Sequence, residues 1–472
     1  MNATLDRALS WARLRFGGRT HLIEERRRVT FVDLDEEVTR RAEALRERGV
    51  CPGDRVTLPI ANTAAHVAVA FGVWRAGGVL VPLNPRLGAP EMEAIASRSG
   101  ARLAVRITPD GAIEIEERPA GAPEDADLAA IAYTSGTTGS PKGVEITHSN
   151  MMWAAAAVMH TRRDGPNAVA AMVSPIGHLP VFVSHYLARL LSGGTVVAAS
   201  FDPDRLARML AEHGITDLPL VPAMVAPLLE RTAPAGLRLR KVTVGSALTP
   251  IEVKEALAAR FPEAEIIEAY GQTESTDGLT MSVGREALER PGTVGRPHVL
   301  IPLAIRRVDG SFADPGEVGE LVCQGPTVMR GYRDDPEATR TALRDGWLHT
   351  GDLGRMDEEG FVYVTGRLKE IIISGGENIS PEEVEAALRD HPAVAEVAVF
   401  GLADARFGEQ VAAAVVARQP VEQDALVEHV THRLARFKRP RRIFFVDALP
   451  KTAAGKVRRN ALRARFAGRP NG

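Results

Sequence analysis

The chain has very little cysteine. Cys51 and Cys323 are the only two among 472 residues, which excludes a disulfide framework and favours a reducing compartment. Neither has partners at metal-ligand spacing, and we expect both to be small buried residues. These features predict a cytoplasmic protein that is not held together by disulfides.

Long hydrophobic runs and an excess of one charge are also missing. The most apolar stretch, 60–83, contains Asn62, His66 and Arg75 and is too polar for a membrane span. The first 14 residues include Asp6 and lack the apolar core of a signal peptide. A formal net charge of −2 gives no reason to expect nucleic acid or a membrane as a partner. We expect small-molecule partners and a monomer or homodimer.

The chain is too long for one hydrophobic core, so we expect at least two domains. From about 129 to 270, strand-like and helix-like segments alternate, which predicts a doubly wound α/β domain with a parallel sheet. Pro250 is typical of an early helical position after Thr249 as N-cap. The expected strands cover 169–173, 194–199, 217–221, 241–245 and 265–270, and the expected helices include 204–213 and 250–260.

Beyond residue 298 the pattern changes. Runs at 304–308 and 320–324, and again at 346–355 and 361–365, flank turns and predict a small antiparallel sheet or barrel. A small α+β domain follows the charged segment 366–369. We expect a large domain at 1–368 and a mobile one at 369–472. The latter is expected to have strands at 370–373, 394–401 and 411–417 and helices at 381–389 and 424–435.

The most informative segment is 133–144, Tyr-Thr-Ser-Gly-Thr-Thr-Gly-Ser-Pro-Lys-Gly-Val. Glycines let backbone N–H groups turn toward an anion, and hydroxyls and a lysine add donors and charge. The Walker A spacing is absent. A Ser/Gly-rich linker is the alternative, but an apolar strand-like run precedes the segment. The predicted phosphate-binding residues are Thr134, Ser135, Gly136, Thr137, Thr138, Gly139 and Lys142.

This segment resembles the phosphate loop of the adenylate-forming enzymes, which include the acyl-CoA synthetases. The resemblance runs in the family's order from about residue 30 to 459. It implies that ATP and a carboxylic acid form an acyl-adenylate with Mg²⁺, and that coenzyme A then takes the acyl group.

The segment 269–274 is similar to the family's second signature. Tyr270 offers a flat face to a purine, and Gly271 permits a tight turn. Glu274 is a hard oxygen ligand suited to Mg²⁺, and Thr134 is its co-ligand by resemblance. Alone, Glu274 is equally consistent with a carboxylate that interacts with a helix dipole. The remaining nucleotide contacts implied by the resemblance are Ser246, Ala247, Ala269, Gln272 and Thr273.

Three further segments resemble motifs of the family. Asp352 and Arg367 are implied to contact the ribose of ATP, since a carboxylate accepts two hydrogen bonds from a diol. Lys369 matches the hinge between the domains. The last signature, 450–457, places Lys456 where it stabilises charge between the carboxylate and the α-phosphate. The implied coenzyme A contacts are Gly375, Gly376 and Glu377.

The acid pocket is less well defined by the sequence. His178 matches a histidine that borders the pocket and joins Lys456, Glu274 and Thr134 in the predicted catalytic set; the alternative for His178 is a hydrogen-bonded packing residue. Asp277 is expected to point to solvent, with a polar substituent of the acid as the alternative partner. The predicted pocket residues are His178, Phe182, Gly245, Thr276, Asp277 and Gly278.

The leading hypothesis is therefore an AMP-forming acid–CoA ligase that uses ATP, Mg²⁺ and coenzyme A. Small pocket residues favour a medium-chain or aromatic acid. Two alternatives stay open at this point. One is an adenylating enzyme that loads a carrier protein, and the other is a non-catalytic homologue that binds a nucleotide or an acyl ligand.

Overall fold

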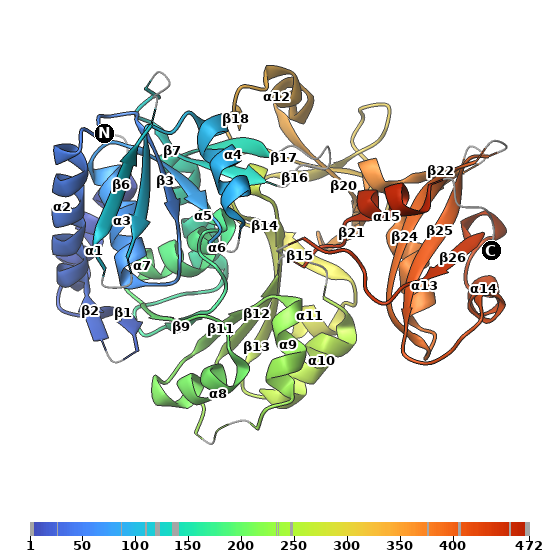
Figure 1. Cartoon of the computed structure of the whole chain (residues 1–472). Helices are drawn as coiled ribbons and strands as arrows, with labels where there is room; N and C mark the ends of the chain where they lie inside the picture. The colour runs from blue at the N-terminus through green and yellow to red at the C-terminus, as the bar shows by residue number, and fades with distance from the viewer. Residues whose placement is uncertain are drawn as a thin grey trace. The chain divides into compact units, whose positions relative to one another are not determined.

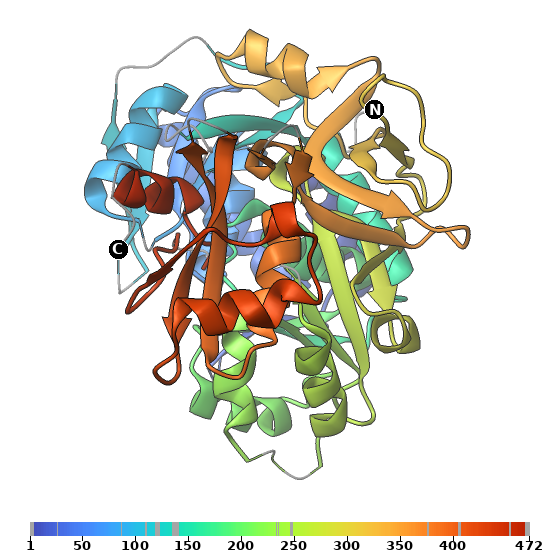
Figure 2. The same cartoon turned by 90° about the vertical axis from the view of Figure 1, so that its right-hand side faces the viewer.

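The structure is a computed structural model of the chain, shown in Figures 1 and 2. It forms two compact units, which are described separately. The first unit comprises Met1–Ala304, Val322–Thr350 and Glu359–Val362, and the second comprises Ile305–Leu321, Gly351–Glu358 and Tyr363–Gly472. The structure describes residues 4–25, 27–85, 87–108, 111–118, 123–134, 141–232, 234, 236–245, 249–374, 377–404, 407–452 and 455–467.

The smaller sheet of the first unit carries the predicted phosphate loop. Its central strands β3, β4 and β7 are parallel, and β8 pairs antiparallel with β7. In sheet order the strands are β18 (Gly331–Tyr332), β8 (Lys142–Thr147), β7 (Leu128–Thr134), β4 (Val79–Leu83), β3 (Arg55–Pro59), β5 (Leu103–Ile107) and β6 (Ile113–Glu117).

The larger sheet of the first unit has a parallel centre. Strands β9 to β13 pair in parallel, which confirms the predicted arrangement. In sheet order the strands are β15 (Thr293–Pro297), β14 (Gly278–Val283), β13 (Glu265–Gly271), β12 (Lys241–Gly245), β11 (Asp217–Leu220), β9 (Val169–Met172), β10 (Thr195–Ala198), β1 (Thr20–Glu24) and β2 (Arg27–Thr30).

Helices cover both faces of this parallel region. Ile266 packs with Leu257 of α10, whereas the next residue, Ile267, packs with Val158 of α5. Successive strand residues point to opposite faces, so the two helices lie on opposite sides. Figure 1 shows α8 to α11, coloured from green to yellow, beside β11 to β13. The helices of the unit are α1 (Leu5–Phe16), α2 (Phe31–Glu47), α3 (Ala64–Arg75), α4 (Ala89–Ser99), α5 (His148–Thr161), α6 (Leu179–Val181), the π-helix η1 (Phe182–Leu187), α7 (Ala188–Ser192), α8 (Pro203–Glu212), α9 (Pro222–Leu229), α10 (Ile251–Arg260), the 3₁₀ turn η2 (Thr273–Ser275), α11 (Arg285–Glu289) and α12 (Pro336–Ala342).

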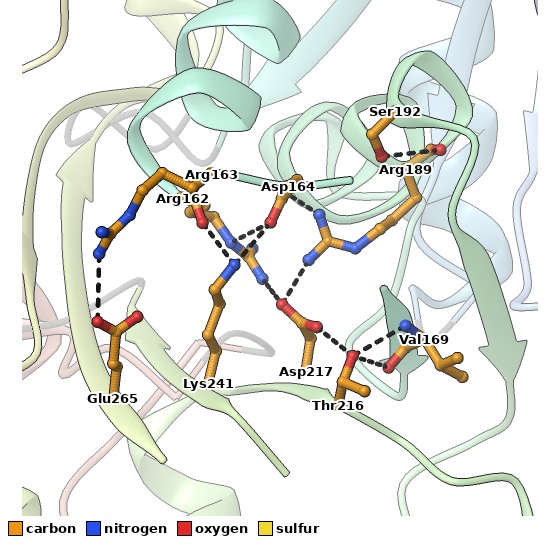
Figure 3. A network of polar contacts seen from close by, with 10 residues as sticks. All are labelled: Arg162, Arg163, Asp164, Val169, Arg189, Ser192, Thr216, Asp217, Lys241 and Glu265. Carbon is orange, nitrogen blue, oxygen red and sulfur yellow. Dashed lines mark hydrogen bonds and ion pairs between the residues drawn. The ribbon is translucent and has the colours of Figure 1, made fainter. Parts of the chain in front are cut away.

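A buried cluster of charges ties helices to the starts of two parallel strands (Figure 3). Asp217 Oδ1 lies 2.9 Å from a guanidinium nitrogen of Arg162 and 2.9 Å from one of Arg189. Asp164 pairs with Arg189, and its Oδ1 lies 3.2 Å from Lys241 Nζ. Arg162, Arg189, Asp164 and Asp217 are all buried. Such a cluster constrains its partners because an unpaired charge in the interior is strongly unfavourable.

Four strands between residues 303 and 367 are divided between the two units. Strand β16 (Leu303–Arg306) neighbours β17 (Gly319–Cys323), and β20 (Trp347–Met356) lies between β17 and β21 (Val362–Arg367). The predicted pairing of these runs is confirmed. Within the first unit, the short β19 (Leu343–Arg344) pairs antiparallel with the residues Trp347 and Leu348 of β20.

The C-terminal sheet is covered on both faces. Along β24, Val397 and Val399 pack in the core with α13 and α14, whereas Ala398 and Phe400 pack with Phe466 of α15. Figure 2 shows this sheet and its helices in orange and red. Its elements are the 3₁₀ turn η3 (Leu368–Glu370), β22 (Ile372–Ser374), β23 (Glu377–Ile379), α13 (Pro381–Arg389), β24 (Val394–Asp404), β25 (Gly408–Ala417), α14 (Gln423–Thr431), η4 (Arg436–Lys438), β26 (Arg442–Phe445) and α15 (Arg459–Phe466).

Two local expectations are wrong. Helix α10 begins at Ile251 with Pro250 as its N-cap, and Thr249 does not cap it, since its buried Oγ1 has no hydrogen-bond partner among the described residues. Cys323 is buried as expected, but Cys51 is exposed.

No described helix combines the length and the apolar character that a membrane span requires. The expected boundary at 368/369 stays a prediction, since the compact units group 305–321 and 351–358 with the C-terminal part.

Candidate active site

The stem of the predicted phosphate loop is a pair of antiparallel strands. Thr134 is the last residue of β7 and faces Lys142, the first residue of β8. The hydroxyl and the ammonium group of these residues therefore stand at the two ends of the connecting loop. Five other predicted contacts lie outside the described residues: Ser135, Gly136, Thr137, Thr138 and Gly139.

Tyr332 connects this stem to the predicted metal ligand. Lys142 Nζ lies 4.7 Å from the centre of the Tyr332 ring, a cation–π contact. The Tyr332 hydroxyl donates to Glu274 Oε1 at 2.9 Å. Burial and the neighbouring Glu274 raise the pKa of Tyr332 well above its usual value, so the hydroxyl keeps its proton. The structure thus brings Lys142 and Glu274, predicted from separate motifs, to the same tyrosine.

Several backbone contacts fix Tyr332 in this place. Strand β18 pairs with β8, with Tyr332 opposite Val144. Asn150, in the first turn of α5, donates to the carbonyl of Val328 at 2.9 Å, and the Met329 N–H donates to the Glu274 carbonyl at 2.8 Å. No motif in the sequence pointed to Tyr332. Its only local signal is an aromatic residue after Gly331, which is too weak to predict a contact 58 residues away.

The second signature forms a tight turn after β13. A Cβ on Gly271 would lie 2.2 Å from the Asp277 carbonyl oxygen, so no larger residue fits there. The Ser275 hydroxyl closes the turn with the carbonyls of Gln272 and Asp277, at 2.9 and 2.8 Å. Thr273 is buried within the turn. Ala269 and Tyr270 belong to β13, while Ser246 and Ala247 lie outside the described residues.

The residues predicted to hold Mg²⁺ have suitable chemistry. Glu274 is a partly buried carboxylate whose Oε1 is fixed by Tyr332, and Thr134 supplies a neutral oxygen. The described residues hold no group of three or more His, Cys, Asp or Glu side chains placed for a metal. Mg²⁺ is commonly held by one or two carboxylates together with substrate phosphates and water, and Glu274 would supply one carboxylate.

Two predicted ribose contacts lie together in the second unit. Arg367 Nε on β21 is 2.7 Å from Asp352 Oδ1 on β20. The Asp352 carboxylate is buried, whereas the Arg367 side chain is partly exposed. Adjacent strands therefore present one acceptor group and one donor group at a single place, which suits the two hydroxyls of a ribose.

Lys456 lies on an exposed turn of the second unit. The Thr452 N–H donates to the Lys456 carbonyl at 2.8 Å, and the Lys456 N–H donates to Thr452 Oγ1 at 3.2 Å. Gly455 closes the turn with a φ of +80°, which favours glycine. The predicted hinge residue, Lys369, belongs to the turn η3.

The predicted coenzyme A contacts are described only in part. Gly375 and Gly376 lie outside the described residues. The backbone of Glu377 begins β23. The coenzyme A site therefore stays a prediction.

The segment before η1 is shaped by close packing. A Cβ on Gly177 would lie 2.8 Å from the Leu83 carbonyl oxygen, so the close approach of the backbone requires glycine at this position. His178 follows and is exposed. Phe182 is buried, with its ring centre 5.2 Å from that of Tyr186. Its role in the acid pocket stays a prediction.

The expectation for Asp277 is wrong. Asp277 is only 8% exposed and does not point to solvent. The cause is the turn that precedes it. Thr276 adopts a φ of +69° and donates to the Thr327 carbonyl at 2.6 Å, which directs the chain inward before β14 begins at Gly278.

Comparison with known proteins identifies the family. Residues 9–333 match the model of the AMP-binding enzyme family, and residues 383–456 match that of the AMP-binding enzyme C-terminal domain. The chain belongs to the AMP-binding enzyme family. A feruloyl-CoA synthase from an Amycolatopsis species is 35% identical over 466 residues, which cover 93% of this chain and 94% of the relative.

Solved structures agree over the whole chain. The o-succinylbenzoate CoA synthetase of Bacillus subtilis, bound to its acyl-adenylate intermediate, matches with a TM-score of 0.89 at 30% identity and covers 100% of both chains. The same synthetase with ATP and magnesium ion matches with a TM-score of 0.87 at 31% identity and covers 96% of this chain and 98% of the other. These matches confirm the predicted fold class and the predicted activity class, an AMP-forming acid–CoA ligase that uses ATP, Mg²⁺ and coenzyme A.

Replacing Tyr332 with phenylalanine tests the contact between Tyr332 and Glu274. The variant keeps the ring that faces Lys142 but leaves Glu274 Oε1 without its donor. Loss of a residue that orients a metal ligand typically weakens metal binding ~10-fold or more. We expect the Mg²⁺ concentration for half-maximal pyrophosphate release to rise on the order of 10-fold.

A matched control uses Tyr363, whose hydroxyl donates to Asp357 at 3.2 Å in the second unit. Tyr363→Phe removes the same kind of bond and is expected to leave the Mg²⁺ dependence unchanged. Equal Mg²⁺ dependence in Tyr332→Phe and the unmodified enzyme would show that Tyr332 does not orient a metal ligand.

Proposed function

We propose that the chain is an AMP-forming ligase that joins an aromatic or medium-chain carboxylic acid to coenzyme A. The observation that carries this proposal is the contact of Tyr332 with both Lys142 and Glu274. A cation from the predicted phosphate loop and a carboxylate from the second signature thereby contact the same tyrosine and lie in one site. We also propose a cytoplasmic location, in view of the scarcity of cysteine, and action as a monomer or homodimer without nucleic-acid or membrane partners.

The first half-reaction joins two anions, so positive charge must be supplied. Lys142 and the loop that follows Thr134 are proposed to neutralise the triphosphate. Thr134 and Glu274 are proposed to hold Mg²⁺, which would neutralise phosphate oxygens. Tyr332 keeps the carboxylate of Glu274 in one orientation. The acid carboxylate then attacks the α-phosphorus and expels pyrophosphate.

The second unit is proposed to supply the remaining contacts. Asp352 and Arg367, already paired at 2.7 Å, are proposed to bind the ribose hydroxyls. Lys456 is proposed to stabilise the charge that develops between the carboxylate and the α-phosphate. Lys369 is proposed as the hinge at which the backbone rotates, so that the coenzyme A thiol then attacks the acyl carbonyl and releases AMP.

The proposed acid class rests on the residues near the second signature. A Cβ on Gly245 would come no closer than 3.5 Å to the Ala269 carbonyl oxygen, so the end of β12 has room for a ligand. Val181, Phe182 and Leu279 are buried apolar residues of one core cluster. A ring or a medium-length chain suits apolar surroundings of this kind. One relative is named a feruloyl-CoA synthase, which supports an aromatic acid.

A pyrophosphate-release assay tests the proposal. The full chain is mixed with ATP, Mg²⁺ and a panel of aliphatic, aromatic and dicarboxylic acids. We expect acid-dependent pyrophosphate release that is fastest with an aromatic or medium-chain acid and is abolished when Mg²⁺ is chelated. Adding coenzyme A is expected to yield AMP and an acyl thioester in equal amounts, measured by chromatography.

Different outcomes separate the alternatives. Transfer to a phosphopantetheine carrier protein but not to coenzyme A would favour carrier loading. Nucleotide binding without acid-dependent pyrophosphate release would indicate a non-catalytic homologue. Either result would overturn the proposed reaction.

A further inference from the structure

Asp277 has an unusual environment for an acidic residue. It lies directly before β14 and is more than nine-tenths buried. Its Oδ2 atom is buried without a hydrogen-bond partner among the residues that the structure describes. A buried polar atom without a partner destabilises the fold, so such an atom in a native structure calls for an explanation.

The surroundings favour the neutral form of the carboxyl group. Burial raises the pKa of Asp277 to about 8, and the Gly278 backbone N–H, the Arg162 guanidinium and the Ser184 hydroxyl oppose this rise only in part. The Ser184 hydroxyl already donates to the Pro180 carbonyl at 2.8 Å. A neutral carboxyl group both donates and accepts hydrogen bonds.

The position of Asp277 points to the acid-binding region. Gly278, the next residue, is the register partner of Gly271 at the end of β13. Ligands of doubly wound sheets bind at the carboxyl ends of the parallel strands. Ser184 belongs to the π-helix η1, which follows His178 in the chain. π-helical turns occur frequently at functional sites. Asp277 belongs to one of the two segments that the sequence predicts for the pocket and lies close to Ser184, which follows the other.

Ser184 and its neighbours also indicate the character of the ligand. Ser184 is partly exposed, so the polar group next to Asp277 is not sealed in the core. Val181 and Phe182, which precede Ser184 in the chain, and Leu279, which follows Gly278, are buried and apolar. An apolar body with one polar group complements such a lining, because the polar group would meet Oδ2 and the rest would meet carbon.

We propose that Asp277 determines specificity by hydrogen bonding a hydroxyl group at the end of the acid remote from its carboxylate. The substrate class would be hydroxylated acids with an apolar body, aromatic or aliphatic. A hydroxyl is favoured over an ammonium group because the neutral carboxyl offers no charge to pair with a cation. This inference rests on the proposed ligase function.

Matched pairs of acids test the proposal in the full-length enzyme. One pair is 3-(4-hydroxyphenyl)propenoic acid and 3-phenylpropenoic acid, and the other is 8-hydroxyoctanoic acid and octanoic acid. Pyrophosphate release gives kcat/KM for each acid. We expect the hydroxylated member of at least one pair to be preferred roughly 10- to 100-fold, the range that follows from leaving a buried polar group unpaired.

Two substitutions test whether Asp277 causes the preference for the hydroxylated acid. Asp277→Leu is expected to make the enzyme prefer the acid without the hydroxyl, because the hydroxyl would then lose its hydrogen-bond partner. Asp277→Asn keeps the size and one acceptor and is expected to retain part of the preference for the hydroxylated acid. The ratio within a pair is measured on one enzyme, so a change in stability or in ATP binding cancels. Retention of the full preference in Asp277→Leu would assign the selectivity to another residue and overturn the proposal.

The remaining outcomes separate this proposal from the proposed function. If no acid supports pyrophosphate release, the ligase function itself fails. If acids react but both members of each pair do so equally, or if 8-aminooctanoic acid is preferred, only the role of Asp277 fails. Should Asp277→Leu not fold, the ratios of the unmodified enzyme and of Asp277→Asn decide the question.

Discussion

Replacing Lys456 with alanine is expected to lower the rate of acyl-adenylate formation by roughly 10²- to 10³-fold, the effect of losing one group that stabilises transition-state charge. The fold should survive, because the turn that carries Lys456 is closed by its own backbone contacts with Thr452 and by Gly455. The Lys456 side chain is exposed and adds nothing to a hydrophobic core. The loss is therefore expected in catalysis and not in stability.

Acid-dependent exchange between ATP and labelled pyrophosphate measures this step directly. Lys451→Ala is the matched control. Lys451 is an exposed lysine five residues earlier, and its Nζ lies 2.5 Å from Glu396 Oε2, so its loss removes a surface ion pair of small energetic weight. We expect the control to exchange at the normal rate. Normal exchange in Lys456→Ala would mean that the last signature does not act in adenylation.

Features with a local sequence signal were predicted well. The strand expected at 241–245 is β12 with the same bounds, and the helix expected at 381–389 is α13. Both depend on short-range patterns of apolar residues and on start signals such as Pro381. The first strand of the phosphate-loop stem was predicted in the same way, because an apolar strand-like run directly precedes the glycine-rich segment.

Features that depend on long-range contacts were not predicted. Tyr332 reaches Glu274 only because β18 pairs with β8 and fixes its direction. Asp277 was expected at the surface because acidic residues seldom lie inside without a partner. Its burial results from the hydrogen bond between Thr276 and the Thr327 carbonyl, which no local pattern reveals.

The buried charges beside the parallel sheet escaped prediction for the same reason. Composition alone places arginine at the surface, yet Arg162 and Arg189 are fully buried. Their partners, Asp164 and Asp217, come from segments up to 55 residues away. The cluster in Figure 3 connects the end of α5 and the helix α7 with the start of β11, so it supports the sheet that carries the second signature.

Replacing Asp217 with asparagine is expected to lower the free energy of unfolding by about 3–5 kcal/mol, the range for removing one partner of a buried pair. With Lys241, the cluster contains three cations and two carboxylates. Asparagine has nearly the same size, but it leaves Arg162, Arg189 and Lys241 with Asp164 as the one carboxylate of the cluster. Urea titration at pH 7 measures the change.

Asp204→Asn is the control, because its Oδ1 lies 2.6 Å from Arg231 Nε and both side chains are exposed. Removing that pair is expected to change the free energy by less than about 1 kcal/mol. Comparable losses in Asp204→Asn and Asp217→Asn would show that the buried cluster holds the unit together no better than a surface ion pair does.

Lowering the pH should reduce the difference in the free energy of unfolding between Asp217→Asn and the unmodified enzyme. Burial alone would raise the pKa of Asp217, but Arg189 and Arg162 outweigh burial and hold that pKa below its usual value. A carboxylate with a lowered pKa stabilises the fold above its unfolded value of about 3.9, and this contribution is lost as the pH falls toward the folded value. We therefore expect the difference in the free energy of unfolding between the two proteins to be constant from pH 7 to about 5 and to decrease below about pH 4. A difference that stays constant through pH 3 would mean that the charge of Asp217 is not what stabilises the cluster.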